Sequence, residues 1–454
     1  MVNGTYFRHY QTLSHLRDSR FWKVIAIRSL VARATAERRG LSTRSSPTWQ
    51  DEAALYIHWP YCKRRCTYCN FNKYIKNDVN EERMKSCLVT ETETLLKMSD
   101  VKYITTIFFG GGTPSLAAPS TMASIINTVH RVTNMAPDAE VTLEANPTNL
   151  ETQKLKDFKA AGINRLSLGI QSLNGEDLKI LGRDHTVAES LRCLREARKI
   201  FPGKTSIDLI FGRPGQTVEN WKKELEMAVS LCDDHISLYQ LTLERGTLLF
   251  KMCSEGIMNL PSDDCLADMY EVAVEILDDA GLSRYEVSNF AREGAESIHN
   301  KNYWNGGQYI GVGPGAHGRF VRRGDGESQR EARIQTLEPE IWMQEVEKYG
   351  HATRKSTPQT QIRILEELLM LGLRTKDGIS DARWRQFSDG ISLQSVLGHS
   401  EVLNGLMENQ LLMQFSGKFL KATPRGLSLI DSIVPDLIIE LQNYYECVKT
   451  GSQG

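Results

Sequence analysis

The segment Tyr56-Ile-His-Trp-Pro-Tyr-Cys62-Lys-Arg-Arg-Cys66-Thr-Tyr-Cys69-Asn-Phe-Asn72 places three cysteines at the spacing Cys-x3-Cys-x2-Cys. It directly follows a short apolar run at 53–57, which we predict to be a buried strand. Iron–sulfur clusters are held by thiolates, and a tight loop of this length can supply three of them. Three thiolates leave one iron of a [4Fe–4S] cluster open to a bidentate ligand.

A structural zinc ion, or no metal at all, is the alternative interpretation of these three cysteines. Structural zinc takes four protein ligands, and here no fourth Cys or His follows at zinc-finger or zinc-ribbon spacing. We therefore predict the cluster. The other cysteines are scattered, which indicates thiols in a reducing compartment and not a disulfide framework. They are Cys87, Cys193, Cys232, Cys253, Cys265 and Cys447.

The composition is that of an ordinary globular protein. The chain has 454 residues, 41% of them hydrophobic and 24% charged, which suggests two or three domains. Residues 1–50 hold nine Lys or Arg and two acidic residues, whereas the rest carries 46 basic and 54 acidic residues, a net charge of −8. A net negative charge over residues 51–454 gives no indication of the basic surface that binds nucleic acids. No stretch reaches the ~18 uninterrupted apolar residues that indicate a transmembrane segment.

Residues 1–47 are rich in Arg, Ser and Thr and poor in acidic residues. Residues 21–36 can form an amphipathic helix, and Arg38-Arg39-Gly-Leu-Ser-Thr-Arg-Ser-Ser is typical of the end of a mitochondrial presequence. The alternative is a basic tail on a cytosolic protein. We predict a presequence over 1–47 and import into the mitochondrial matrix, a location that also suits an iron–sulfur protein.

Apolar runs alternate with helix-like segments through the first half of the chain. This alternation predicts an α/β fold with a parallel sheet, either doubly wound or a partial barrel. In such folds ligands bind at the carboxyl ends of the strands. The predicted strands lie at 53–57, 104–109, 139–145, 164–170, 205–211 and 235–241.

Glycine-rich and polar segments follow the ends of these predicted strands. Consecutive glycines in Phe109-Gly-Gly-Gly-Thr113-Pro can bring backbone N–H groups close to an anionic ligand. Each polar residue alone could equally be a helix cap or a solvated loop residue. Together they offer acceptors for hydroxyls and an amine, and a cation for a carboxylate. The segments are Glu144-Ala-Asn-Pro147, Gly169-Ile-Gln171-Ser, Gly182-Arg183-Asp-His185, and Asp208 with Phe211-Gly-Arg-Pro-Gly-Gln216.

From Tyr56 to about Leu243 the chain resembles the oxygen-independent coproporphyrinogen III oxidase family of radical S-adenosylmethionine (SAM) proteins, and within it the HemW haem chaperones and their mitochondrial member. The resemblance implies a partial (β/α)6 TIM-like radical SAM barrel, for which we set the bounds 48–290. It implies a [4Fe–4S] cluster on Cys62, Cys66 and Cys69, with its open iron chelated by the amine and carboxylate of SAM. It also implies SAM contacts from Tyr56, Tyr68, Gly111, Gly112, Thr113, Glu144, Gln171, Arg183 and Asp208.

The segment His299-Asn-Lys-Asn-Tyr303-Trp304 distinguishes two functions within this family. The resemblance assigns an H-N-x-x-Y-W motif to the HemW branch. Its imidazole can ligate haem iron, and Tyr303 and Trp304 offer flat apolar faces to a porphyrin. The structural alternative is that His299 caps a loop and Trp304 fills a seam between domains. His317, within the glycine-rich segment 311–318, is a second candidate ligand.

Residues 291–454 are expected to form a mainly α-helical, HemW-like C-terminal domain. An exposed polar loop is predicted at 322–330, and helical periodicity resumes after it. Helices are predicted at 338–350 and 358–371.

The end of the chain resembles a winged-helix module. A hairpin of 411–415 with 419–422 precedes Thr423 and Pro424, which we expect to start a last amphipathic helix as N-cap and first helical residue. The module lacks a basic stripe for DNA. We therefore expect it to cover the mouth of the barrel or to hold substrate.

Two functions stay open at this point. The first is a haem carrier that delivers haem to haemoproteins of the respiratory chain. The second is a radical enzyme that cleaves SAM and decarboxylates coproporphyrinogen III. The cysteine motif begins soon after the predicted presequence, without the longer N-terminal extension of the decarboxylating branch, so we expect the carrier. The motifs do not decide whether SAM is cleaved.

Overall fold

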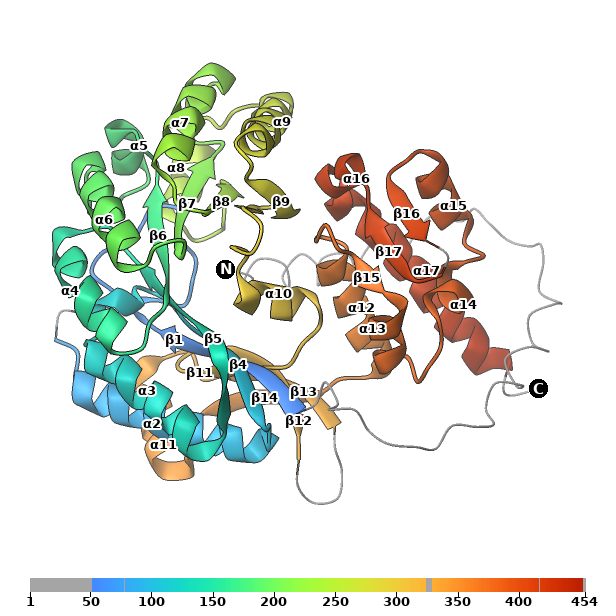
Figure 1. The fold of residues 1–454 in the computed structure, drawn as a ribbon, viewed down its shortest axis with the longest axis horizontal. Coiled ribbons are helices and arrows are strands. Elements are labelled where there is room, and N and C mark those ends of the chain that lie inside the picture. Colours follow the sequence, from blue (N-terminus) through green and yellow to red (C-terminus); the bar gives the residue numbers. More distant parts are fainter. Residues whose placement is uncertain (1–50, 77, 324–328, 416, 452–454) are drawn as a thin grey trace.

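The computed structural model describes residues 51–76, 78–323, 329–415 and 417–451. The presequence predicted at 1–47 and most of the polar loop predicted at 322–330 lie outside these residues. A curved sheet carries helices on its outer side, and a helical C-terminal part stands beside its open side (Figure 1). None of the described helices is long and apolar enough to cross a membrane.

Six parallel strands form the centre of the sheet, in the order β1-β4-β5-β6-β7-β8. All six were predicted, because each contains a short apolar run that is buried in the sheet; β5 begins at Asn134, earlier than the predicted 139, with residues that are not buried. β7 is buried at every position. The strands are β1 (Glu52–Trp59), β4 (Tyr103–Gly111), β5 (Asn134–Ala145), β6 (Arg165–Gln171), β7 (Thr205–Phe211) and β8 (His235–Gln240).

The sheet continues beyond these strands at both edges. β11 (Tyr309–Val312) pairs in parallel with β1, and three antiparallel strands follow it outward. The sheet therefore has strands on both sides of residue 290, where we placed a domain boundary, and that boundary stays a prediction. The remaining strands are β12 (His317–Arg322), β13 (Gln329–Gln335) and β14 (Thr353–Pro358) at one edge, and β10 (Asn289–Ala291) and β9 (Ser283–Glu286) at the other.

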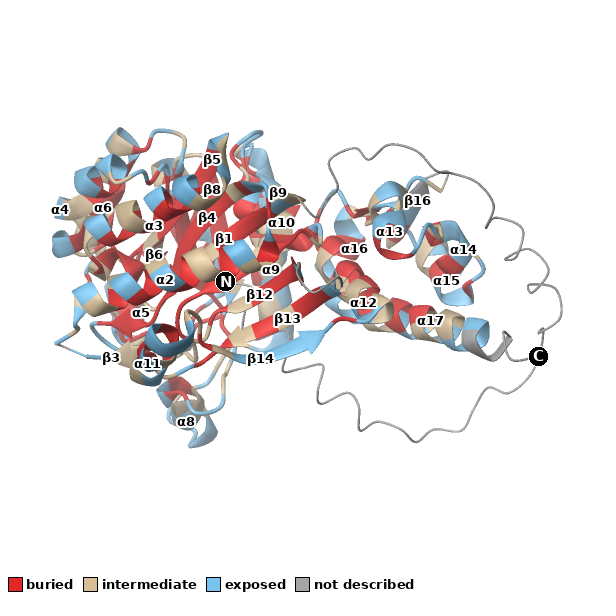
Figure 2. Cartoon of the chain, turned by 90° about the horizontal axis from the view of Figure 1, so that it is seen from below, coloured by how far each residue is buried: buried red, intermediate tan, exposed pale blue. Residues whose placement is uncertain are grey.

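The edge strand β14 is almost entirely exposed, in contrast to the buried central strands (Figure 2). Its sequence, Thr-Arg-Lys-Ser-Thr-Pro, is polar, charged and ends in proline. Charges and proline discourage a further strand from pairing with an exposed edge.

The main hydrophobic core lies between the sheet and the helices that follow its strands. Trp221 and Phe158 are fully buried in it. Complete burial of a large apolar side chain contributes about 1.5–3 kcal/mol. Three of these helices, α4, α6 and α7, begin at a threonine whose hydroxyl accepts a backbone N–H, which fixes where each helix starts. The outer helices are α2 (Glu81–Ser99), α3 (Pro119–Val132), α4 (Asn149–Ala160), α6 (Val187–Ile200), α7 (Val218–Leu231), α9 (Asp263–Asp279) and α11 (Pro339–Tyr349).

The C-terminal module has a hydrophobic core of its own, which includes Leu369, Trp384 and Leu437. The predicted hairpin is confirmed as β16 (Leu412–Phe415) and β17 (Phe419–Ala422), and β17 also pairs with β15 (Ile379–Ser380). The helices predicted at 338–350 and 358–371 are confirmed as α11 and α12. The helices of the module are α12 (Gln361–Gly372), α13 (Asp381–Phe387), α14 (Leu393–Leu397), α15 (Glu401–Glu408), α16 (Pro424–Ser428) and α17 (Ile430–Gly451).

One expectation in this module is wrong. Thr423 does act as an N-cap, since its hydroxyl accepts the N–H of Gly426 at 3.0 Å. It starts the five-residue α16, however, and not the last helix. Leu429 leaves the helical conformation and ends α16, so α17 starts separately at Ile430.

Candidate cluster and cofactor site

The cysteine loop is held in place by contacts to distant segments. Its two ends pair as β2 (Tyr61–Cys62) and β3 (Tyr74–Ile75). In its middle, the N–H of Thr67 donates to the carbonyl of Leu181 at 3.0 Å, and the carbonyl of Thr67 accepts the N–H of Leu249 at 2.9 Å. The fold therefore fixes the course of this loop.

The thiols of Cys62, Cys66 and Cys69 are free and line one cavity. Burial raises the pKa of Cys62 to about 11, and the hydroxyl of Thr113, which donates to its sulfur at 3.3 Å, opposes this shift. Arg183 Nη1 donates to Cys66 Sγ at 3.3 Å. Donors aimed at sulfur stabilise thiolates, the form that binds iron.

The three thiols suit a cluster in their chemistry. Among the described residues, no three His, Cys, Asp or Glu side chains are placed to hold a single metal ion. A [4Fe–4S] cluster does not need three side chains that converge on one ion, because each of the three thiolates binds a different iron atom.

The glycine turn after β4 packs directly against the cysteine loop. Gly112 N–H donates to the carbonyl of Trp59 at 2.7 Å, and Thr113 N–H donates to that of Tyr61 at 2.9 Å. Gly111 has φ +108°, and a Cβ there would lie 2.6 Å from the ring of His58. We expected these N–H groups to face a ligand. They are instead used within the protein, so glycine is needed here for loop packing.

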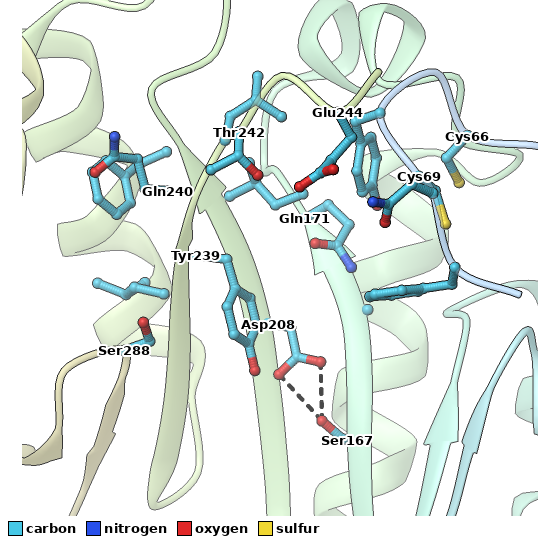
Figure 3. A pocket seen from close by; sticks show the side chains of 18 of the residues that line it. Cys66, Cys69, Ser167, Gln171, Asp208, Tyr239, Gln240, Thr242, Glu244 and Ser288 are labelled. Atoms are coloured by element: carbon cyan, nitrogen blue, oxygen red, sulfur yellow. Dashed lines mark hydrogen bonds between the residues drawn. The ribbon is translucent and has the colours of Figure 1, made fainter. Parts of the chain in front are cut away.

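A cavity of about 730 Å³ opens at the carboxyl ends of the strands. All the predicted cluster and SAM residues line it except Tyr56. In Figure 3 Cys66 and Cys69 lie on one side of the cavity, Tyr239 on the other, and Gln171 and Asp208 between them. The separate sequence motifs therefore meet in one place, as expected for a ligand site at the carboxyl ends of parallel strands.

Two carboxyl groups face the cavity, the half-buried Glu144 from β5 and the buried Asp208 from β7. Glu144 accepts the N–H of Gly111 at 3.2 Å, and burial, assisted by the nearby Asp208, raises the pKa of Glu144 to about 7. Burial likewise raises the pKa of Asp208 to about 6, against the effect of the Ser167 hydroxyl, which donates to both carboxylate oxygens (Figure 3). Near neutral pH these groups can accept hydrogen bonds from an amine or from hydroxyls.

Arg183 and Gln171 each present a polar atom that lacks a partner within the described protein. Arg183 Nη2 donates to Asn146 Oδ1 at 2.6 Å and to the carbonyl of Gly169 at 2.9 Å, but its Nε is buried and unpaired. The Oε1 atom of Gln171 is also buried and unpaired. Unpaired buried polar atoms are costly, so they indicate a place where a ligand supplies the partner.

The backbone of Gln171 is in the left-handed region, with φ +68°, which is unusual for a residue other than glycine. A buried ion pair beneath the cavity supports this turn. Arg213 binds Glu224 and donates to the carbonyl of Gln171 at 3.4 Å, while Glu224 accepts the N–H of Leu173 at 2.7 Å. Within the sequence motif 211–216, only Phe211 lines the cavity. Arg213 of that motif instead supports the turn at Gln171.

Tyr56 and Tyr68 occupy different positions. Tyr68 lines the cavity, whereas Tyr56 does not. His58 Nε2 donates to the carbonyl of Asn72 at 2.8 Å, so Nδ1 accepts the hydroxyl of Tyr56 at 3.1 Å. Burial lowers the pKa of His58 to about 4, which keeps it neutral. Tyr56 thus supports the end of the cysteine loop, and its contact with SAM stays a prediction.

Comparison with known proteins places the chain in a family. Residues 56–228 match the Radical SAM superfamily, and residues 359–429 match the HemN C-terminal domain. The chain is 51% identical to "Radical S-adenosyl methionine domain-containing protein 1, mitochondrial" of Danio rerio, over 90% of this chain and 91% of that protein. It is 33% identical to the heme chaperone HemW of Bacillus subtilis, over 79% of this chain and 92% of HemW. The chain belongs to the HemW family.

The HemW-family fold is shared with a solved enzyme structure. Coproporphyrinogen III oxidase (HemN) from Escherichia coli, a radical SAM enzyme, has a TM-score of 0.69 and 21% sequence identity. The match covers 86% of this chain and 90% of HemN. At this identity the likeness shows the fold alone, and it confirms the radical SAM architecture with a mainly helical C-terminal part.

The H-N-x-x-Y-W segment of this HemW-family chain forms α10 (Ile298–Trp304), which packs inside the barrel (Figure 1). His299 is 1% exposed and does not line the cavity. Its Nδ1 is 2.7 Å from the hydroxyl of Thr106, its Nε2 is 2.5 Å from that of Tyr303, and its ring stacks on Phe108. Both ring nitrogens are therefore engaged. The haem role of His299 stays a prediction, and it requires α10 to move.

A buried carboxylate holds α10 in this position. Glu140 accepts the N–H groups of Ile298 and His299 and pairs with Arg165 at 3.5 Å. These contacts lie on the side of the barrel away from the cavity mouth. Tyr303 and Trp304 are buried as well.

His317, the second haem candidate, begins β12 and is partly exposed. Burial lowers its pKa to about 4. A neutral imidazole is the form that can bind haem iron.

Sequence reasoning missed the far side of the cavity. The end of β8 and the chain after it contribute Tyr239, Gln240, Thr242 and Glu244. Because ligands bind at the carboxyl ends of parallel strands, these residues could have been predicted. Other lining residues come from α9 and from the C-terminal module, where no local pattern marks them. They include Leu266, Tyr270, Arg374, Leu429 and Asp431. The module thus forms part of the cavity wall, and its role in covering the barrel mouth or holding substrate stays a prediction.

Proposed function

We propose that this chain is a haem chaperone of the mitochondrial matrix that delivers haem to haemoproteins of the respiratory chain, and that it carries a [4Fe–4S] cluster and SAM. The observation that carries the proposal is the meeting of Cys62, Cys66 and Cys69 with the predicted SAM residues in one cavity, in a chain of the HemW family. Relatives named mitochondrial support the location.

In this proposal the three thiolates hold the cluster and the open iron takes the methionyl end of SAM. Arg183 is the cation for the SAM carboxylate, and its unpaired Nε fits that role. Glu144 and Asp208 accept hydrogen bonds from the amine and the ribose hydroxyls. When bound, the cluster supplies an iron that orients SAM and can pass on one electron.

We place haem against the H-N-x-x-Y-W segment, with His299 as an axial ligand or close contact and Tyr303 and Trp304 as one wall. Because His299 is enclosed by Thr106, Tyr303 and Phe108, haem enters only when α10 leaves the barrel. Haem binding therefore involves a conformational change, and we expect it to be slow compared with diffusion.

The proposal is tested by two assays on the same anaerobically reconstituted protein. We expect it to retain haem through gel filtration and to pass it to the apo form of a respiratory b-type cytochrome. We expect no decarboxylation of coproporphyrinogen III when SAM and a reductant are supplied. Failure to retain haem would contradict the carrier function. Turnover of coproporphyrinogen III would favour the radical enzyme.

A further inference from the structure

Two arginines from different parts of the fold meet at the C-terminal end of α10. Arg383 on α13 donates from Nε to the carbonyl of Asn305 at 2.7 Å. Arg330 on β13 donates from Nη1 to the carbonyl of Gly306 at 2.9 Å. Both guanidinium groups lie over the ring of Phe387, at 4.9 Å and 5.6 Å from its centroid. Two positive charges are therefore held close together where the H-N-x-x-Y-W segment ends.

The charge of Arg383 has no acidic partner. Within the described part of the chain Arg383 forms no ion pair, and its other side-chain hydrogen bond goes to Gln386. Burial and the charge of Arg330 lower the pKa of Arg383 to about 10. Burial also lowers the pKa of Arg330; Glu367 opposes this shift, but that carboxylate is itself paired with Arg319 at 3.1 Å. A half-buried cation without a carboxylate is destabilising, so it indicates a place for an anionic ligand.

A purely structural role for these arginines would be to cap α10. Arginine side chains can donate to the last carbonyls of a helix, where they also favour the helix dipole. Neutral donors would serve these carbonyls without bringing two cations together. The cap also depends on α10 staying in the barrel. Asn305 and Gly306 directly follow α10, so its departure removes both acceptors and leaves the two guanidinium groups without them.

The haem of the proposed function offers the missing negative charge. Its edge carries two propionate carboxylates, and guanidinium groups bind carboxylates through charge-assisted, often bidentate hydrogen bonds. Asn305 follows His299 by six residues, which is about 9 Å along a helix axis. The arginines are thus within the reach of a porphyrin from the candidate axial ligand.

We propose that Arg383 and Arg330 bind the propionate carboxylates of haem, which replace the carbonyls at the end of α10. The movement of α10 that admits haem also releases the donors that its carboxylates need. The inference rests on the haem binding of the proposed function, and it names the residues that select a porphyrin with free carboxylates.

The test compares haemin with its dimethyl ester, in which both carboxylates are esterified, on the full-length, reconstituted protein. Arg383→Gln removes one charge of the pair, and Arg383→Lys keeps the charge without the planar guanidinium. Arg385→Gln is the matched control, because it removes an exposed charge from the same helix, where Arg385 pairs with Asp381. Affinity is measured by titration at the Soret band, and urea unfolding checks that the variants are folded.

We expect the wild type and Arg385→Gln to bind haemin about tenfold more tightly than the ester. Arg383→Gln should bind haemin about tenfold more weakly than the wild type does and bind the ester equally well, and Arg383→Lys should recover part of the affinity for haemin. Equal affinity of the wild type for both ligands would overturn the proposal. Unchanged haemin affinity in Arg383→Gln, or an equal loss for both ligands, would also overturn it, because only the capping role would be left. A wild type that binds neither ligand would instead refute the proposed function.

Discussion

At the scale of single residues, the protonation of the cavity groups is controlled mainly by burial. Burial raises the pKa of Cys62 to about 11, that of Glu144 to about 7 and that of Asp208 to about 6. Each shift means that burial favours the protonated form of the group, compared with the same group in water. A bound metal or an amine-bearing ligand reverses this preference, because it stabilises the charged form. Ligand binding and proton release are therefore linked at this site.

The first prediction concerns the thiols. Cys66→Ala should lose the iron and the visible absorbance of the reconstituted protein, because two thiolates cannot hold the cluster. Cys193→Ala, which changes a buried thiol on α6, should keep both. Iron content and absorbance after anaerobic reconstitution check this. Full iron in Cys66→Ala would remove the basis of the assignment.

The second prediction concerns the pH dependence of SAM binding. The carboxylate of Glu144 accepts hydrogen bonds and its protonated form accepts them less well, so with a pKa of about 7 SAM should bind about tenfold more tightly at pH 8 than at pH 6. Glu144→Gln should weaken SAM binding and flatten this dependence. Glu151→Gln changes a buried acid outside the cavity lining and should leave the dependence in place. Equilibrium binding at several pH values measures it, and an unaltered pH profile in Glu144→Gln would contradict the assigned role.

At the scale of the elements, the turn after β6 depends on support from β7 and α7. Arg213 is 1% exposed and binds Glu224, and together they hold the backbone at Gln171 and Leu173. The left-handed backbone of Gln171 costs free energy that this buried pair offsets. The geometry of the cavity is thus maintained by residues that do not line it.

The third prediction follows from that support. Glu224→Ala removes one of the two carboxylates that pair with the buried guanidinium of Arg213 and leaves the partly buried Asp177, so it should lower the free energy of unfolding by about 3 kcal/mol. Glu176→Ala, which removes an exposed partner of Lys179, should cost less than about 0.5 kcal/mol. Urea unfolding of both variants measures the difference. Equal stability would show that the buried pair does not support the turn.

The fourth prediction concerns α10. His299→Ala should weaken haem binding and shift the Soret band, since a lost axial ligand changes the field at the iron. His317→Ala should do neither if His299 is the ligand. Haem titration of both variants, without the cluster, separates the two histidines. Unchanged affinity and spectrum in His299→Ala would make α10 a structural plug.

Sequence reasoning succeeded where the determining information is local. Each of the six central strands contains a short apolar run, and Cys62, Glu144 and Asp208 meet near the carboxyl ends of these strands as predicted. β11 was missed because its partner β1 lies some 250 residues earlier, and four residues form only a weak local pattern. The burial of His299 was missed for the same reason, since it depends on contacts with β4 and β5.

At the scale of the whole molecule, the cavity is lined both by the barrel and by the C-terminal module. Arg374 of the C-terminal module pairs with Glu286 on β9 at 3.1 Å and also binds Asp431 at the start of α17. Arg284 on β9 donates to the carbonyl of Pro424 at 2.6 Å. These contacts tie the module to the edge of the sheet. The cavity therefore has the cysteine loop in one part of its wall and the C-terminal module in another, and both belong to one site.

The most direct test of the central claim is the electron paramagnetic resonance spectrum of the dithionite-reduced, reconstituted protein, recorded with and without SAM. If Cys62, Cys66 and Cys69 hold a [4Fe–4S] cluster whose fourth iron is open to the cavity, saturating SAM should change the spectrum, because its amine and carboxylate alter the field at that iron. A cluster signal that saturating SAM leaves unchanged would contradict the account.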